Sequence, residues 1–292
     1  MTIAQAHAQT QSILSAANCE KKEAQATARI LLDEISGVAH AHLMRPEGVL
    51  SPAQKLRFDA AWSELQKGRP LAYVLATREF CGLRFTCDER ALIPRPETEL
   101  LVEAALEKLP SQNSLLKTYT IADLGTGSGC IAISLAHALP DAEIYATDIS
   151  PAALELAREN AVANGVDARI HFLSGIENDW AAPLKEYSLP CDLIVSNPPY
   201  IPREEIEILP CEIRDYEPHR ALDGGSDGLD CYRQIASQCQ TLLKPDGALM
   251  CELGAEQFSD VRAIFERQNW RVENLILDFA GIERILVAQL NR

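Results

Sequence analysis

The chain has 292 residues, of which 47% are hydrophobic and 24% charged, and its formal net charge is −15. This composition is typical of a globular protein with a sizeable core, and the acidic surplus disfavours a free DNA- or RNA-binding protein, because nucleic-acid affinity rests largely on neutralising phosphates. No apolar run is long enough to span a bilayer, and the N-terminus lacks a signal-peptide pattern. We therefore expect a cytoplasmic protein without membrane association.

The nine cysteines are scattered along the chain. None belongs to a Cys-x-x-Cys pair, and none lies beside closely spaced histidines. This pattern disfavours a zinc site and a disulfide framework, so we expect buried thiols and no bound metal.

The N-terminal residues show helical spacing. Apolar residues recur at steps of three and four in two stretches: Ala24, Ala28, Leu31, Ile35, and Phe58, Ala61, Leu65. Ser51-Pro52 is a typical helix start, and Gly68-Arg69-Pro70 is a typical stop. We predict a small helical bundle domain over residues 1–70.

A change of pattern follows. Phe80, Gly82, Leu83, Phe85 and Cys87 predict a short β-hairpin within a linker over residues 71–92. The run 93–99, Ile-Pro-Arg-Pro-Glu-Thr-Glu, then begins a third region (93–292) with a helix over 97–109.

From residue 119 strands and helices alternate. The predicted strands are 120–124, 143–147, 169–173, 192–196, 248–253, 272–277 and 284–289. The predicted helices are 131–139, 151–164, 230–243 and 259–268. Such alternation predicts an α/β fold with a mainly parallel sheet covered by helices.

A glycine-rich loop follows the first of these strands. Gly125-Thr126-Gly127-Ser128-Gly129 lies between a strand and a helix, which is the context of nucleotide-like cofactor sites. The G-x-G-x-G spacing differs from the G-x-G-x-x-G of dinucleotide sites. Asp123, just before the loop, suits the ammonium group of a bound amino acid and not a pyrophosphate. The loop therefore predicts S-adenosylmethionine in preference to NAD.

The second strand ends at Asp148-Ile149. Asp148 lies 19 residues after Gly129, about where a ribose-binding carboxylate belongs, and we assign both residues to the cofactor site. The alternative is an ordinary tight turn with an aspartate that caps the next helix.

The fourth strand runs into Asn197-Pro198-Pro199-Tyr200. In an open α/β sheet, ligands lie beyond the carboxyl ends of the strands, so this tetrapeptide is expected beside the cofactor. The Asn197 side-chain oxygen and the Pro198 carbonyl can accept the two hydrogens of a planar NH2 group, and Tyr200 can stack on it. We predict that Asn197, Pro198 and Tyr200 are catalytic, that all four residues bind the acceptor, and that Asn197 also contacts the cofactor. The alternative is a proline-rich turn.

These motifs resemble class I S-adenosylmethionine-dependent methyltransferases that act on amino or amide nitrogens. Three further segments narrow the resemblance to the HemK/PrmC family: 78–83, 92–99, and 216–229 with its Tyr-Glu-Pro start. The resemblance covers nearly the whole chain and implies a Rossmann-like seven-stranded sheet with a helical N-terminal domain joined by a β-hairpin. Members of that family are glutamine N5-methyltransferases of class-1 peptide chain release factors.

The resemblance implies a target and a product. The target is the glutamine of the Gly-Gly-Gln loop of a release factor, which the helical domain and hairpin help to engage, and the cofactor product is S-adenosyl-L-homocysteine. We expect a monomer whose partner is this protein and not a nucleic acid. The stretch 174–180 departs from the family pattern, so either Ile176 or Trp180 is expected to cover the adenine.

Three rival functions remain for comparison. A DNA adenine methyltransferase would use the same tetrapeptide on an exocyclic amine, but it must flip a base and hold the backbone, which the acidic balance opposes. A non-catalytic module would be expected to lack one of the motifs, and all are present. An NAD oxidoreductase is disfavoured by the glycine spacing and by Asp123.

Overall fold

The computed structural model describes residues 1–16, 21–109, 118–187 and 190–291. They form two compact units. The first contains Met1–Thr77 together with Cys211–Tyr216, and the second contains Arg78–Pro210 and Glu217–Arg292. Within these ranges no helix has the length and apolar character needed to cross a membrane.

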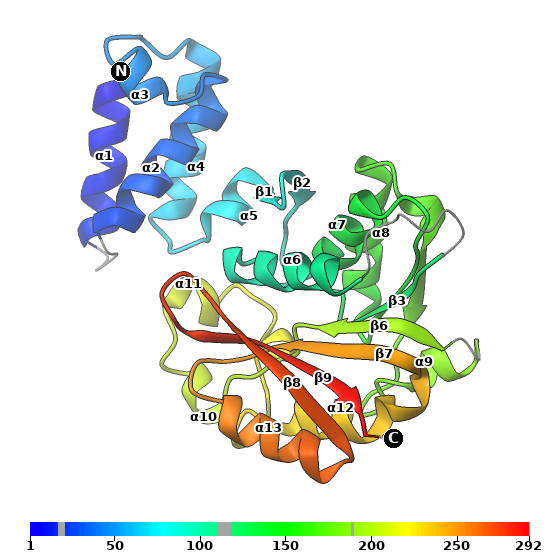
Figure 1. Cartoon of the computed structure of the whole chain (residues 1–292). Helices are drawn as coiled ribbons and strands as arrows, with labels where there is room; N and C mark the ends of the chain where they lie inside the picture. Colours follow the sequence, from blue (N-terminus) through cyan, green and yellow to red (C-terminus); the bar gives the residue numbers. More distant parts are fainter. Residues whose placement is uncertain (17–20, 110–117, 188–189, 292) are drawn as a thin grey trace. The chain divides into compact units, whose positions relative to one another are not determined.

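The first unit is helical, as its apolar spacing predicts (Figure 1). Its helices are α1 (Ile3–Ala16), α2 (Lys21–Ser36), α3 (Ala41–Met44), α4 (Pro52–Leu65), α5 (Leu71–Leu75) and α11 (Cys211–Arg214). The Ser51 hydroxyl caps α4 by accepting from the Gln54 N–H, and Gln54 Oε1 accepts from the Ser51 N–H. The predicted start of this helix is therefore confirmed. Buried side chains from α1, α2 and α4, such as Ile3, Leu31 and Phe58, form its core.

The predicted hairpin is present but shorter than the segment assigned to it. Strands β1 (Thr77–Phe80) and β2 (Leu83–Thr86) pair, whereas residues 71–75 form helix α5. The two turn residues, Cys81 at φ 48° and Gly82 at φ 71°, are both left-handed, as a tight two-residue hairpin requires. Phe80 and Phe85 are buried in the core of the second unit.

The second unit is built on a seven-stranded sheet with the order β5-β4-β3-β6-β7-β9-β8 (Figure 1). The strands are β3 (Thr120–Leu124), β4 (Glu143–Asp148), β5 (Ile170–Ser174), β6 (Cys191–Ser196), β7 (Leu243–Glu252), β8 (Trp270–Leu277) and β9 (Glu283–Leu290). Strands β3 to β7 are mutually parallel, and β9 is antiparallel to both of its neighbours. The predicted α/β sheet is confirmed.

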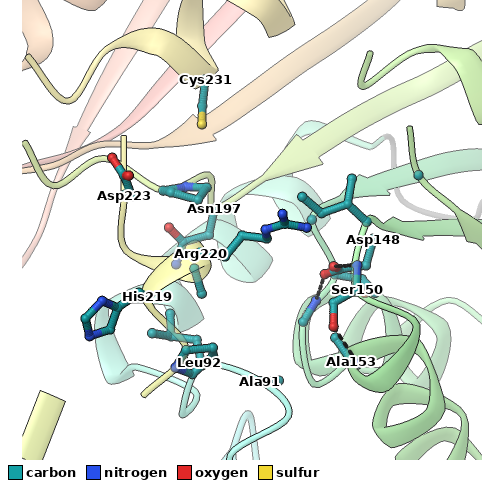
Figure 2. A pocket seen from close by; sticks show the side chains of 18 of the residues that line it. Ala91, Leu92, Asp148, Ser150, Ala153, Asn197, His219, Arg220, Asp223 and Cys231 are labelled. Atoms are coloured by element: carbon teal, nitrogen blue, oxygen red, sulfur yellow. Dashed lines mark hydrogen bonds between the residues drawn. The ribbon is translucent and has the colours of Figure 1, made fainter. Parts of the chain in front are cut away.

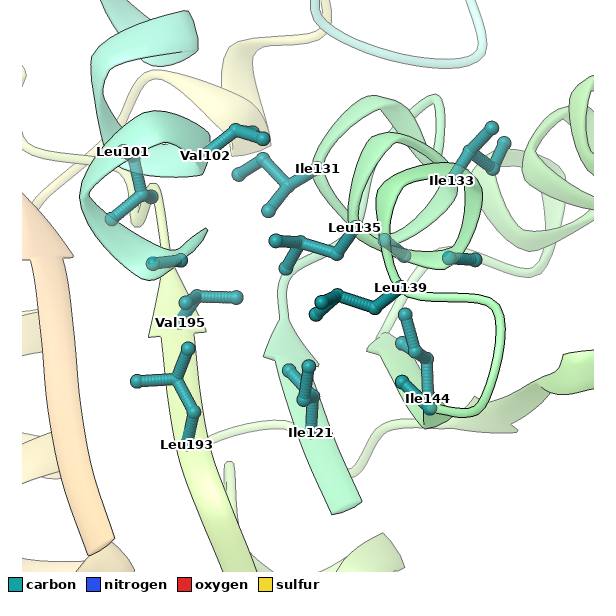
Figure 3. Packing of buried hydrophobic residues seen from close by; sticks show 14 of the residues in the cluster. Leu101, Val102, Ile121, Ile131, Ile133, Leu135, Leu139, Ile144, Leu193 and Val195 are labelled. Carbon is teal, nitrogen blue, oxygen red and sulfur yellow. The ribbon is translucent and has the colours of Figure 1, made fainter. Parts of the chain in front are cut away.

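Helices cover both faces of this sheet. The longer ones are α6 (Glu99–Lys108), α7 (Cys130–Ala138), α8 (Pro151–Ala163), α12 (Asp230–Gln238) and α13 (Phe258–Arg267). Short turns of helix are η1 (Pro96–Thr98), η2 (Asp167–Arg169), α9 (Ala182–Lys185), α10 (Arg203–Ile206), η3 (His219–Ala221) and η4 (Cys239–Leu242). Figure 3 shows Leu101 of α6 and Leu135 of α7 packed against Ile121, Ile144 and Val195 of the sheet.

One predicted helix is wrong at its end. Helix α12 ends at Gln238 and tightens into η4, and Leu243 already belongs to β7, which begins five residues before its predicted start. The Trp270 indole donates to the Ala236 carbonyl at 2.7 Å, so this acceptor is engaged by a residue distant in sequence. The tertiary contact favours the tighter turn over further α-helix.

Candidate active site

A cavity of about 930 Å³ lies in the second unit, at the carboxyl ends of the parallel strands. Its wall includes residues of the glycine loop and of the segments after β4, β5 and β6. Figure 2 shows Asp148 and Ser150 on one side of it, and Asn197, His219 and Asp223 on the other. Because parallel strands end at one edge, motifs far apart in the sequence meet here.

The three glycines of the loop have left-handed φ angles but different surroundings. Gly125 (φ 73°) and Gly127 (φ 56°) line the cavity. Gly129 (φ 82°) does not line the cavity. It faces two helices instead, since a Cβ there would lie 2.9 Å from Ile133 Cδ1 and 3.1 Å from Ala157 Cβ. Gly129 therefore allows the start of α7 to pack closely on α8, while the first two leave room for a ligand against the backbone.

Asp148 orders the turn after β4, but Ser150 and not Asp148 caps the next helix, α8. Its Oδ2 accepts from the Gly127 N–H at 2.9 Å, and its Oδ1 accepts from the Ser150 N–H at 2.8 Å (Figure 2). The carboxylate thus orders the turn, yet it lines the cavity, and each oxygen has a further lone pair for a hydroxyl. Burial raises its pKa, although the backbone N–H groups of Ser150, Gly127 and Ile149 oppose this shift.

Asp123 is fully buried and does not form part of the cavity wall. Its Oδ2 accepts from the Thr126 hydroxyl at 2.6 Å, whereas Oδ1 has no hydrogen-bond partner. Burial raises the pKa of this carboxyl to about 7. The Ser128 hydroxyl, on the wall itself, is likewise buried without a partner. Unsatisfied polar atoms at the loop fit a site that binds a polar ligand, as S-adenosylmethionine would be.

Both residues considered for the adenine, Ile176 and Trp180, line the cavity. Ile176 is 56% exposed. Trp180 is held from two sides, since its indole N–H donates to Gln234 Oε1 at 2.9 Å and its backbone N–H donates to Gln238 Oε1 at 2.8 Å. Its ring lies against the loop, 3.2 Å from where a Cβ on Gly125 would be.

Asn197 follows β6 and lines the cavity together with Pro199. Its Nδ2 donates to Thr98 Oγ1 at 3.1 Å. This contact assigns the amide nitrogen to Thr98, and Asn197 Oδ1 remains available as an acceptor. Pro198 is buried and Tyr200 half-buried, and neither belongs to the wall.

Glycines pack closely around Tyr200. A Cβ on Gly224 would lie 2.8 Å from Tyr200 Cα, one on Gly228 would lie 2.4 Å from its carbonyl oxygen, and one on Gly254 would lie 2.9 Å from Cδ2. The Tyr200 carbonyl also accepts from Gln257 Nε2 at 2.9 Å. Burial raises the pKa of its phenol. Gly228 lies in the segment 216–229 that resembles the family, and this close packing accounts for a glycine there.

The segment after Pro218 closes the cavity on one side. Glu217 anchors it, since its buried carboxylate accepts from Arg95 at 2.6 Å and from the Ile93 N–H at 3.1 Å. His219 and Arg220 line the cavity. The Arg220 charge opposes the rise in the Asp148 pKa. The sequence alone had suggested no function for these two residues.

Two residues that matter at this site, Thr98 and Glu252, were not singled out from the sequence. Thr98 lies on the cavity wall, and Glu252 is the last residue of β7. A buried acid at the end of an apolar strand, aligned with the strand that precedes Asn197, is the signal that identifies Glu252.

Known proteins resemble this chain in sequence over most of its length. Two family models match: the PrmC N-terminal domain over residues 5–75 and the methyltransferase small domain over residues 97–209. The release factor glutamine methyltransferase of Moorella thermoacetica is 42% identical over 290 residues, which cover 99% of this chain and 98% of that protein. The one of Bradyrhizobium diazoefficiens is 39% identical over 280 residues, with coverage of 93% and 90%.

Solved structures agree on the fold. The structure of a human methyltransferase 10 domain containing protein superposes with a TM-score of 0.56 at 18% identity, covering 83% of this chain and 100% of that one. A methyltransferase from Pyrococcus furiosus gives 0.52 at 14% identity, covering 77% and 98%. Together with the family models, they confirm the predicted methyltransferase fold of class I.

Proposed function

The chain belongs to the family of release factor glutamine methyltransferases, and from this membership we propose that it methylates N5 of the glutamine in the Gly-Gly-Gln motif of a class-1 release factor. The observation that carries the proposal is the position of Asn197. It lies on the wall of the cavity formed by the glycine loop, with its amide nitrogen already bonded to Thr98.

We infer that S-adenosylmethionine, which supplies an electrophilic methyl group on its sulfonium, binds at the glycine loop. In this proposal Gly125, Gly127 and Ser128 hold the amino-acid portion, with Asp123 and Thr126 behind them and Gly129 ordering the helix start. Asp148 accepts from the ribose hydroxyls. Support comes from the unpartnered oxygens of Asp123 and Ser128 and from the spare lone pairs of Asp148.

We assign the adenine cover to Trp180, with Ile149 and Ile176 at the edge of the ring. Trp180 is the better-ordered surface because Gln234 and Gln238 hold it, and an indole offers a larger stacking face than an exposed isoleucine.

The acceptor glutamine is held by the tetrapeptide after β6. Asn197 Oδ1 and the Pro198 carbonyl accept hydrogen bonds from the two N–H groups of the glutamine amide. These bonds direct the amide nitrogen toward the methyl donor. Pro199, on the cavity wall, is proposed to provide the flat contact surface together with Tyr200, which is half-buried and lies outside the wall. Methyl transfer is an in-line displacement in which the S–CH3 bond breaks as the N–CH3 bond forms and the amide nitrogen then releases one of its two protons to water, so orientation of the two partners supplies much of the rate. The glycines packed around Tyr200 keep this surface in place.

We also propose that the first unit contributes to release-factor recognition. The PrmC N-terminal domain matches residues 5–75, so this region is a family feature and not an addition peculiar to this chain. The second unit by itself contains the whole cavity wall, which leaves the first unit free for a role in binding.

A methyl-transfer assay tests the proposal. Purified release factor, the same factor with Gln→Ala in its Gly-Gly-Gln loop, and plasmid DNA are each incubated with labelled S-adenosylmethionine. We expect label on the wild-type factor alone, and loss of most of it with the Asn197→Ala enzyme. Label on the Gln→Ala factor or on DNA would overturn the proposed acceptor.

A further inference from the structure

A hydrogen-bonded chain of buried groups continues behind Asn197. Asn197 Nδ2 donates to Thr98 Oγ1 at 3.1 Å, and the Thr98 side chain acts on the Glu252 carboxyl group as a hydrogen-bond donor, which lowers the pKa of that carboxyl against the effect of burial. Thr98 and Glu252 are each 2% exposed. The other carboxyl oxygen, Glu252 Oε2, is buried without a partner.

The fold brings these groups together from three separate segments. Strands β6 and β7 pair in parallel with Ser196 opposite Cys251, so the next residues, Asn197 and Glu252, lie abreast at the end of the sheet. Thr98 comes from the last position of η1, in front of α6. The register of the sheet therefore places these three side chains together, and they do not belong to one local turn.

The charge of Glu252 decides which way the hydrogen bonds run. A threonine hydroxyl has a single proton. While Glu252 is ionised, this proton is donated to the carboxylate, and Thr98 Oγ1 can only accept from its other neighbour. That neighbour must then present an NH2 group, which fixes the amide of Asn197 with its nitrogen toward Thr98 and its oxygen toward the opposite side.

We propose that Thr98 and Glu252 are positioning residues for methyl transfer: they hold Asn197 so that its side-chain oxygen, and not its nitrogen, meets the acceptor amide. The inference rests on the proposed function, because only an NH2 acceptor requires an oxygen at this place. A rotated Asn197 would set one NH2 group against another, and neither could accept.

The orientation of the Asn197 amide should depend on pH. Burial raises the pKa of Glu252 to about 7. The charged or titratable groups that act on it are Arg95, Glu97, Tyr200, Tyr232 and Arg284. Once protonated, Glu252 can donate to Thr98, whose own proton then turns toward Asn197 and favours the rotated amide. Acceptor binding should weaken as the pH falls through this range, and not as it rises.

The test compares Thr98→Val, Thr98→Ser and Glu252→Gln with the wild-type enzyme in steady-state assays on release factor from pH 6 to pH 8.5. We expect Thr98→Val to lower kcat/KM by about 10- to 100-fold, as expected for a buried polar group left unpaired. Thr98→Ser, which keeps the hydroxyl, restores most of it. Glu252→Gln loses the rise of kcat/KM with pH. The dissociation constant of S-adenosylmethionine, measured by calorimetry, stays within about twofold of the wild-type value in these variants. The reason is that Thr98 and Glu252, which we call the relay, orient a side chain that faces the acceptor.

A second measurement does not depend on the release factor. The side-chain NH2 signals of Asn197, identified by their absence in Asn197→Ser, are followed by NMR in the full-length enzyme. They should shift with pH around neutrality in the wild type, and lose this dependence in Thr98→Val and Glu252→Gln. Signals that are unchanged in both variants would overturn the relay even if methylation is observed. Signals that behave as expected would support it even if the assayed release factor is not the substrate.

Discussion

Asp123 and Glu252 are carboxyl groups at or near the ends of buried strands, and burial raises the pKa of each to about 7. An acid with a raised folded-state pKa binds its proton more tightly in the folded chain than in the unfolded one. Its contribution to stability is full below the unfolded-state pKa near 4 and is lost as the pH rises through about 7. Both groups therefore make the protein less stable at pH 8 than at pH 5.

Asp123→Asn should reduce this pH dependence, because an amide stays neutral throughout. We expect the thermal midpoint of the variant to fall less between pH 5 and pH 8 than that of the wild type, by an amount equivalent to at most a few kcal/mol. Thermal melts at both pH values measure it, with the exposed Asp141→Asn as control. Parallel curves for Asp123→Asn and wild type would show that Asp123 is not protonated in the folded state.

Trp180 gives the cofactor site a spectroscopic signal. Because its ring lines the cavity, binding of S-adenosylmethionine should change tryptophan fluorescence, and Trp180→Phe should remove the change. Trp62→Phe, in helix α4, should leave it intact. Trp180→Ala should raise the dissociation constant by about 10- to 100-fold, the usual effect of losing an aromatic stack on a base. A larger effect of Ile176→Ala would reassign the adenine cover.

At the scale of elements, two glycines of the segment 217–229, Gly224 and Gly228, lie against Tyr200. Gly228 and Gly281 have nearly the same left-handed φ, 75° and 80°. A Cβ on Gly228 would lie 2.4 Å from the Tyr200 carbonyl oxygen, whereas one on Gly281 would meet nothing within 4 Å. The two positions thus share the backbone strain of a substitution and differ in the clash.

Gly228→Ala should therefore impair catalysis, and Gly281→Ala should not. Displacing Tyr200 by about 1 Å can lower activity on the order of 100-fold. Gly281→Ala should cost only about 1 kcal/mol of stability from the left-handed φ. Methylation assays and thermal melts of both variants measure the difference. Equal activity in the two would mean that the position of Tyr200 does not limit methyl transfer.

The sequence predicted those parts of the site that are contiguous along the chain. The glycine loop and the tetrapeptide after β6 each carry their geometry in adjacent residues, and each lies where the strand-helix alternation placed it. The Thr98–Glu252 contact could not be predicted in this way, because it depends on the register of β6 with β7. The early end of α12 was missed for a related reason, since Trp270 lies in another strand.

For the whole molecule, the net charge is divided unequally between the two units. The first unit carries nine basic and nine acidic residues, so the entire net charge of −15 belongs to the second. Nucleic acid would meet a strongly acidic unit at the cavity, in keeping with a protein acceptor. A first unit with no net charge suits a surface that binds another protein without long-range repulsion.

The first unit is also discontinuous, since residues 211–216 belong to it while their neighbours on both sides belong to the second. Tyr216 donates to the Lys67 carbonyl at 2.9 Å, and Cys211 Sγ lies 3.0 Å from where a Cβ on Gly68 would be. A chimera that takes only residues 1–77 from a relative would pair this six-residue segment with foreign neighbours. This mismatch should lower the melting temperature of the chimera. Transplanting residues 211–216 as well should restore it. Natural recombination at a single crossover would meet the same mismatch, so the two units are expected to be inherited together.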